Sequence, residues 1–174
     1  PNTLFPYTTL FRSSEIYTIP TQVIHAADAI AEWIKGNIKK PILIGPDEES
    51  HQWVLDVAKK AGAPYTVLTK IRHGDNDVEV SAPDVDQYRD YTPVLVDDII
   101  STAHTMIETV KHLKKAGMKS PVCIGVHAVF AGNGYEALQA IGIEKIVTCN
   151  TIPHPSNAID LSRLLAKHLQ DKAA

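Results

Sequence analysis

The feature that most constrains the fold of this chain is the alternation of short, wholly apolar runs with longer amphipathic runs. From Ser14 onward, the apolar runs are short enough to be strands, and the runs between them carry apolar residues at helical spacing. Strands that are apolar throughout are typical of a sheet buried on both faces, and intervening helices connect such strands in parallel. The sequence therefore predicts an α/β fold with a mostly parallel sheet and helices on both faces.

The individual elements follow from the same pattern and its start and stop signals. The expected strands are 41–45, 65–68, 94–96, 122–126 and 146–149, with an edge strand at 78–80. The expected helices are 24–38, 48–61, 105–116, 135–141 and 161–169. Ligands of parallel sheets bind beyond the carboxyl ends of the strands. A site is therefore expected in the loops after Gly45, Leu68, Val96 and Val126.

Composition narrows the class of protein. The chain has 174 residues, of which 44% are hydrophobic and 21% charged, with a formal net charge of -3. These values indicate one soluble domain with a core of its own and no basic surface for nucleic acid. No apolar run approaches the ~20 residues of a membrane span. Cys123 and Cys149 each lie in an apolar run, so we expect buried free thiols in a reducing compartment, the cytoplasm.

The first residues do not share the alternating pattern. The segment Thr3–Ser13 (TLFPYTTLFRS) resembles the translation of a sequencing adapter. A signal peptide, the alternative, would need a basic start and a continuous apolar core, and the segment has neither. We therefore expect residues 1–13 to be a non-native scar that packs poorly against the domain formed by residues 14–174. Extensive burial of its aromatic side chains in the main core would contradict this interpretation.

The run PVLVDDIISTAHT, which ends at Thr105, carries the chemistry. An apolar strand leads into two adjacent carboxylates, Asp97 and Asp98, and then into a loop of small hydroxyl residues that enters a helix. A helix N-terminus attracts an anion, and Ser101, Thr102 and Thr105 can add hydroxyl donors. Carboxylates accept hydrogen bonds from sugar hydroxyls, so the run predicts a pocket for a ribose 5-phosphate unit. The alternative is an acidic turn followed by Ser or Thr capping of the helix.

The same run resembles the phosphoribosyl signature shared by type I phosphoribosyltransferases and ribose-phosphate diphosphokinases. The resemblance implies a type I phosphoribosyltransferase-like fold and a ribose 5-phosphate site made of Asp97, Asp98, Ser101, Thr102, Ala103, His104 and Thr105. Ser101 stands where diphosphokinases usually have aspartate, and His104 stands where glycine is common. Because glycine permits unusual dihedral angles, His104 either changes the loop geometry or adds a partly cationic group that assists phosphate binding.

Two further segments resemble diphosphokinases rather than transferases. The segment GPDE resembles the one that helps to hold magnesium, which implies that Asp47 supports Mg²⁺; alternatively, Asp47 only caps a helix. The segment LTKIR resembles a basic strand-end element before the family's catalytic loop. This implies that Lys70 and Arg72 are catalytic groups that neutralise the transferring diphosphate; alternatively, they are solvated surface charges. The family more often has arginine in place of Ile71.

Other residues carry weaker signals. His127 lies in a segment that resembles the family's strand-end histidine, where it either faces the site or is a hydrogen-bonded residue of the core or rim. The remaining histidines, His154 among them, show no metal-ligand spacing and are expected to be surface or structural residues. Trp33 and Trp53 fall at helical core positions and are expected to pack rather than to bind a nucleotide.

The resemblance implies an enzyme that transfers the diphosphate of ATP to the anomeric hydroxyl of ribose 5-phosphate, with Mg²⁺ as cofactor, in a homo-oligomer. Family members have two related domains, so residues 14–174 would be the carboxyl-terminal one and inactive alone. The sequence lacks the glycine-rich motifs of generic ATPases and dehydrogenases. The alternatives are a type I phosphoribosyltransferase and a catalytically inactive regulatory homologue.

Overall fold

The computed structural model describes residues 17–20, 23–46, 50–72, 78–81 and 86–173. The expectation about residues 1–13 lies outside these described residues. Within them, no helix combines the length and the apolar character needed to cross a membrane.

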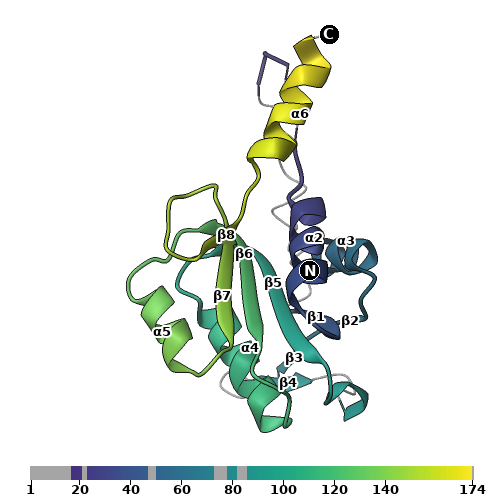
Figure 1. Cartoon of the computed structure of the whole chain (residues 1–174). Helices are drawn as coiled ribbons and strands as arrows, with labels where there is room; N and C mark the ends of the chain where they lie inside the picture. The colour runs from purple at the N-terminus through teal and green to yellow at the C-terminus, as the bar shows by residue number, and fades with distance from the viewer. Residues whose placement is uncertain (1–16, 21–22, 47–49, 73–77, 82–85, 174) are drawn as a thin grey trace, which may run out of the picture.

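A six-stranded sheet forms the centre of the molecule, with its strands in the order β2-β1-β5-β6-β7-β8 and every neighbouring pair parallel (Figure 1). A separate antiparallel ribbon pairs β3 with β4. The strands of the main sheet are β1 (Pro41–Gly45), β2 (Tyr65–Val67), β5 (Thr92–Ile100), β6 (Val122–Ala128), β7 (Lys145–Cys149) and β8 (Asn157–Ile159). The ribbon consists of β3 (Thr69–Arg72) and β4 (Val78–Ser81).

Helices cover both faces of the main sheet (Figure 1). The helices are α2 (Ala27–Asn37), α3 (His51–Ala61), η2 (Asp86–Tyr88), α4 (His104–Lys115), α5 (Gly134–Ala140) and α6 (Ser162–Ala173). One apolar core lies under α2 and α3, and a second lies under α4 and α5 on the opposite face. In Figure 1, α6 extends away from the sheet. The predicted α/β fold with a mostly parallel sheet is confirmed.

The two cores explain why the strand sequences are apolar throughout. Successive residues of a strand point to opposite faces. In β5, Val94 and Val96 belong to the core under α2 and α3, whereas Leu95 belongs to the core under α4 and α5. A polar residue at any of the three would be buried, because all are 0% exposed.

The structure differs from the sequence-based expectations at several elements. β5 runs from Thr92 to Ile100 instead of ending at position 96, because its ladder with β6 continues through Ile99 and Ile100. The expected edge strand at 78–80 is β4, which pairs with β3 outside the main sheet. The short strand β8 was not expected; only three residues long, it carries too few residues for a pattern. Trp33 and Trp53 pack against the core under α2 and α3, as expected.

Gly125 in β6 tests how tightly β5 and β6 are packed. A Cβ at this position would lie 2.6 Å from Cγ1 of Ile100, a side chain that is only 1% exposed. Because Ile100 has little room to move, we expect Gly125→Ala to lower the free energy of unfolding by about 1–3 kcal/mol, measured by urea denaturation. Gly36→Ala in α2 is the matched control, since a Cβ there meets nothing within 4 Å. The control should stabilise the protein by about 0.5–1 kcal/mol; equal effects would contradict the prediction.

Cys123 and Cys149 are buried free thiols, as the sequence predicts. Burial raises the pKa of each thiol to about 12. Only the thiolate is nucleophilic, so at pH 8 neither should react with a disulfide reagent until the chain unfolds. The pKa of each thiol is higher in the folded state than in the unfolded state, where it is about 8.5. The neutral thiols therefore contribute to the stability of the fold below about pH 8.5, and this contribution is lost as pH rises toward 12. Reagent kinetics with and without urea provide the measurement, and rapid labelling of the native protein would contradict it.

Candidate functional site

The strand order reverses between β1 and β5, which marks the expected position of a ligand. From β1 the chain moves outward to β2, and from β5 it moves outward in the other direction through β6, β7 and β8. The register pairs Ile44 with Leu95, so β1 and β5 deliver their following residues to the same edge of the sheet. Open parallel sheets bind ligands in the crevice at such a reversal. The residues after Ile44 and Leu95 therefore define the candidate site.

Asp97 and Asp98 lie in the last part of β5, within the strand and not in a following loop. Asp97 is half-buried and Asp98 is exposed, and the Asp98 N–H donates to Asp97 Oδ1 at 2.9 Å. Because successive strand residues alternate between faces, the two carboxylates lie on different sides of the strand end. Asp98 thus presents an accessible acceptor, while Asp97 is held by the backbone beside it.

The segment that follows begins α4 without a capping side chain. Ala103 is the N-cap residue and adopts a left-handed conformation (φ 59°, ψ 11°), and no side chain accepts a hydrogen bond from the helix start. The alternative interpretation, Ser or Thr capping of this helix, is therefore wrong. The first N–H groups of a helix have no intrahelical partner, and together with the helix dipole they attract an anion. An outlying backbone angle at such a position is typical of ligand-binding loops.

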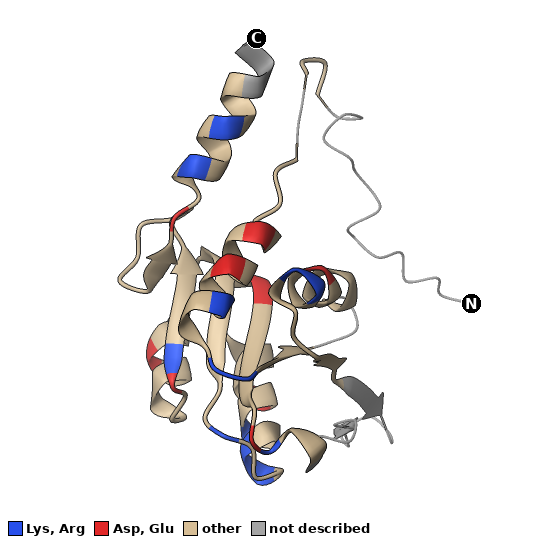
Figure 2. Ribbon diagram, turned by 45° about the vertical axis from the view of Figure 1, so that its right-hand side comes forward, with Lys and Arg blue, Asp and Glu red and all other residues tan. Residues whose placement is uncertain are grey.

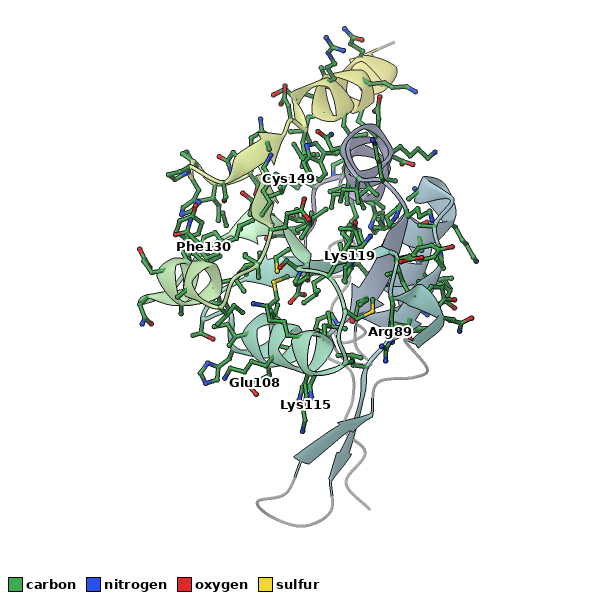
Figure 3. The ribbon with its side chains drawn as sticks, turned by 60° about the horizontal axis from the view of Figure 1, so that its bottom comes forward. Arg89, Glu108, Lys115, Lys119, Phe130 and Cys149 are labelled. Carbon is green, nitrogen blue, oxygen red and sulfur yellow. The ribbon has the colours of Figure 1, made fainter. Side chains whose placement is uncertain are left out.

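The connection between β6 and α5 contacts the backbone of the segment that leads from β5 into α4. The Phe130 N–H donates to the Ile100 carbonyl at 2.8 Å, at the residue where β5 ends. A Cβ on Gly134 would lie 2.6 Å from the Ser101 carbonyl oxygen, so glycine lets the start of α5 approach the loop backbone. Figure 3 places Phe130 beside α5. The 101–105 loop is thus held by contacts to its backbone.

His127 is a hydrogen-bonded residue at the rim of the site. It pairs with Ile99 in the β5–β6 ladder, and its Nδ1 lies 2.9 Å from Thr151 Oγ1. The Thr151 hydroxyl donates its one hydrogen to the Val126 carbonyl at 2.9 Å. Nδ1 of His127 must therefore be the donor to Thr151, which leaves Nε2 as the remaining nitrogen of the ring.

Of the residues predicted to serve the diphosphate, the structure describes the backbone of Lys70 and Arg72. Asp47 is outside the described residues. Lys70 and Arg72 lie in β3 of the antiparallel ribbon, which corrects the expectation that they lie on a loop. The Leu68 N–H donates to the Gly45 carbonyl at 3.0 Å, so β3 leaves the sheet at the edge where β1 ends. Figure 3 shows the ribbon extending away from the sheet.

The described part of the candidate site consists mainly of side chains that bear oxygen. In Figure 2, Lys and Arg are spread over several elements, α2, α3, α4, α6 and β7 among them, whereas the end of β5 carries acidic residues. Among the described residues, no three His, Cys, Asp or Glu side chains come together as a metal site. The described site therefore comprises two carboxylates, the hydroxyl groups of the 101–105 loop and the helix N-terminus.

Sequence reasoning did not find the contribution of the β6–α5 connection. Phe130 and Gly134 act through backbone contacts to Ile100 and Ser101, about 30 residues earlier in the chain, for which no local pattern exists. The only available signal was the glycine at position 134 directly before a predicted helix.

The chain is similar in sequence to known proteins. The sequence profile of the phosphoribosyl transferase domain matches residues 12–164. A ribose-phosphate pyrophosphokinase of Methanobrevibacter smithii is 30% identical over 90% of this chain and 56% of its own length. One of Sulfurisphaera tokodaii is 31% identical over 80% of this chain and 50% of its own length. The chain spans about half the length of the curated relatives it matches.

Solved structures show the same fold. A phosphoribosylpyrophosphate synthetase from Mycobacterium smegmatis matches with a TM-score of 0.71 and 20% identity, over 84% of this chain and 50% of that chain. An orotate phosphoribosyltransferase from Aeropyrum pernix matches with a TM-score of 0.53 and 16% identity, over 83% of this chain and 75% of that chain. The predicted likeness to type I phosphoribosyltransferases is thereby confirmed for the fold.

Proposed function

The chain belongs to the phosphoribosyl transferase domain family, and we propose that it is the carboxyl-terminal domain of a ribose-phosphate diphosphokinase. The curated relatives named ribose-phosphate pyrophosphokinase, the same activity, support this proposal. The structural observation that carries it is the pair of strand-end carboxylates followed by an uncapped helix N-terminus. The two buried thiols are consistent with a cytoplasmic enzyme.

In the proposed reaction, the anomeric hydroxyl of ribose 5-phosphate attacks the β-phosphorus of ATP, and AMP leaves. The 5-phosphate binds the free N–H groups at the start of α4, with the hydroxyls of Ser101, Thr102 and Thr105 as additional donors. Asp98 and Asp97 accept hydrogen bonds from the vicinal hydroxyls of the ribose. Holding the sugar at both ends orients its anomeric hydroxyl, and such positioning accounts for much of the catalysis of phosphoryl transfer.

The second substrate needs positive charge, which the described strand ends do not supply. Lys70 and Arg72 in β3 are the proposed source, because the ribbon leaves the sheet at the edge where β1 ends. Mg²⁺ typically takes one or two protein carboxylates together with substrate phosphates, so a set of carboxylates without a closed cage fits this ion. Asp47 is the proposed ligand. When bound, Mg²⁺ neutralises charge on the phosphates of ATP.

The first prediction from this function concerns the sugar. Asp98→Ala should weaken ribose 5-phosphate binding at least about tenfold, since one hydrogen bond to a charged group contributes about 1.5–3 kcal/mol. Isothermal titration of the 174-residue chain provides the measurement. Asp90→Ala is the matched control, because Asp90 is also exposed but precedes the other end of β5. Unchanged affinity in the Asp98 variant would show that the sugar does not bind at this site.

The second prediction separates the diphosphokinase from a transferase. The full-length gene product should form AMP from ATP when given ribose 5-phosphate and Mg²⁺. Lys70→Ala should lower turnover by about 10²-fold or more, the loss typical of one charge-stabilising group, while ribose 5-phosphate binding stays nearly unchanged. Lys35→Ala, an exposed change in α2, is the control. A product that makes no AMP but converts phosphoribosyl diphosphate and a nucleobase to a nucleotide would establish the transferase instead.

A further inference from the structure

Three aromatic rings from separate segments meet beside the 101–105 loop. Phe130 lies between β6 and α5, Tyr135 lies in the first turn of α5, and His154 lies between β7 and β8. The ring centroids are 5.1 Å apart for Phe130 and Tyr135, 4.6 Å for Phe130 and His154, and 4.7 Å for Tyr135 and His154. These separations are those of attractive aromatic pairs, and each ring contacts both others. We call this cluster the aromatic triad.

A chain of hydrogen bonds fixes the ring of His154. The Ser156 N–H donates to His154 Nδ1 at 3.2 Å, so this nitrogen is an acceptor, and Ser156 Oγ lies 2.7 Å from it. Ser156 Oγ in turn lies 2.8 Å from Oγ of Thr148, which is fully buried in β7. Asn157 Nδ2 donates to Thr148 Oγ1 at 2.9 Å. The ring orientation of His154 is therefore tied to β7 and β8.

The triad in turn holds the segment that supports the loop. Phe130 adopts a left-handed backbone conformation, with φ 41°, which is unfavourable for a residue with a bulky side chain. Its N–H donates to the Ile100 carbonyl, and four residues later Gly134 abuts the Ser101 carbonyl oxygen. Any movement of Phe130 therefore moves the two backbone contacts on which the loop rests. The packing of its ring against His154 and Tyr135 opposes that movement.

We propose that His154 is a positioning residue for the phosphate-binding loop and that it acts through the ring of Phe130. The inference rests on the proposed function, because it assigns to His154 the alignment of the 101–105 loop with the 5-phosphate. His154 contacts the supporting segment through ring packing against Phe130 and Tyr135, so its ring and not its hydrogen-bonding nitrogen is the part that sets loop geometry. The nitrogen serves to orient the ring.

Two substitutions separate the ring from the nitrogen. His154→Asn keeps an acceptor for the Ser156 N–H, since an Asn side chain commonly bonds the backbone two residues on, but it removes the ring. His154→Phe keeps the ring and removes the acceptor. Phe130→Leu removes the ring at the other partner and keeps apolar bulk. Tyr91→Leu is the matched control, because it breaks the Tyr88–Tyr91 edge contact (5.2 Å) at the opposite end of β5.

Two readouts on the 174-residue chain test the proposal. The first is hydrogen exchange of the Phe130 amide, which donates to Ile100. The second is the affinity for ribose 5-phosphate and for inorganic phosphate by titration calorimetry. His154→Asn and Phe130→Leu should each accelerate the exchange. Each should also weaken the affinity for both ligands at least about threefold, a loss in the range expected for one or two aromatic contacts. His154→Phe keeps the ring and loses only the hydrogen bonds that orient it, so it should change both readouts less than His154→Asn does, whereas Tyr91→Leu should leave them unchanged.

Each outcome decides between defined alternatives. If His154→Phe weakens binding as much as His154→Asn, the nitrogen is the active part and the proposal is wrong. If His154→Phe does not fold, the comparison of Phe130→Leu with Tyr91→Leu decides, and equal effects of these two overturn the proposal. If the wild type binds neither ligand, the proposed function fails. The exchange of the Phe130 amide then still tests the positioning role, and unchanged exchange in His154→Asn and Phe130→Leu overturns it.

Discussion

The parallel ladder between β5 and β6 is the interaction on which the rest of the site depends. Its paired residues extend from Val94 and Val122 to Ile100 and Ala128, and all four are buried. The ladder therefore carries Asp97 and Asp98 to the edge of the sheet as strand residues, whose backbone is rigid compared with that of a loop. Gly125 makes this possible, because the absence of a side chain lets Ile100 pack directly over β6.

The proposed phosphate-binding end of the site is built from backbone more than from side chains. Ala103 begins α4 in a left-handed conformation and offers no capping oxygen, so the helix start is available to an external anion. Its position is secured by Phe130 and Gly134, which contact carbonyl groups at the end of β5. Contacts to the backbone depend little on the loop side chains, so a site of this kind can carry Ser101 and His104. What it requires is that the supporting segment stays in place.

The fold was predictable because its strands and helices have local signatures. Val94, Leu95 and Val96 form an uninterrupted apolar run, which a strand shows when both faces are buried, and the two cores confirm this directly. Gly117, with φ 76°, follows the end of α4, where a left-handed glycine commonly ends a helix. The true length of β5 was not predictable. Asp97 and Asp98 are poor strand formers, and only pairing with β6 keeps them extended.

The sequence by itself determined the α/β class, the two carboxylates and the hydroxyl-rich loop, because residue type and spacing along the chain are sufficient to specify them. Only the tertiary structure decided that α4 begins at Ala103 without a capping side chain, that Lys70 lies in an antiparallel ribbon, and that His154 contacts Phe130. Each of these depends on the pairing of segments distant in the chain. The free energy of such pairings comes from buried area and backbone hydrogen bonds. Which distant segments pair cannot be read from the local order of residues, so His154 had the appearance of an ordinary surface histidine.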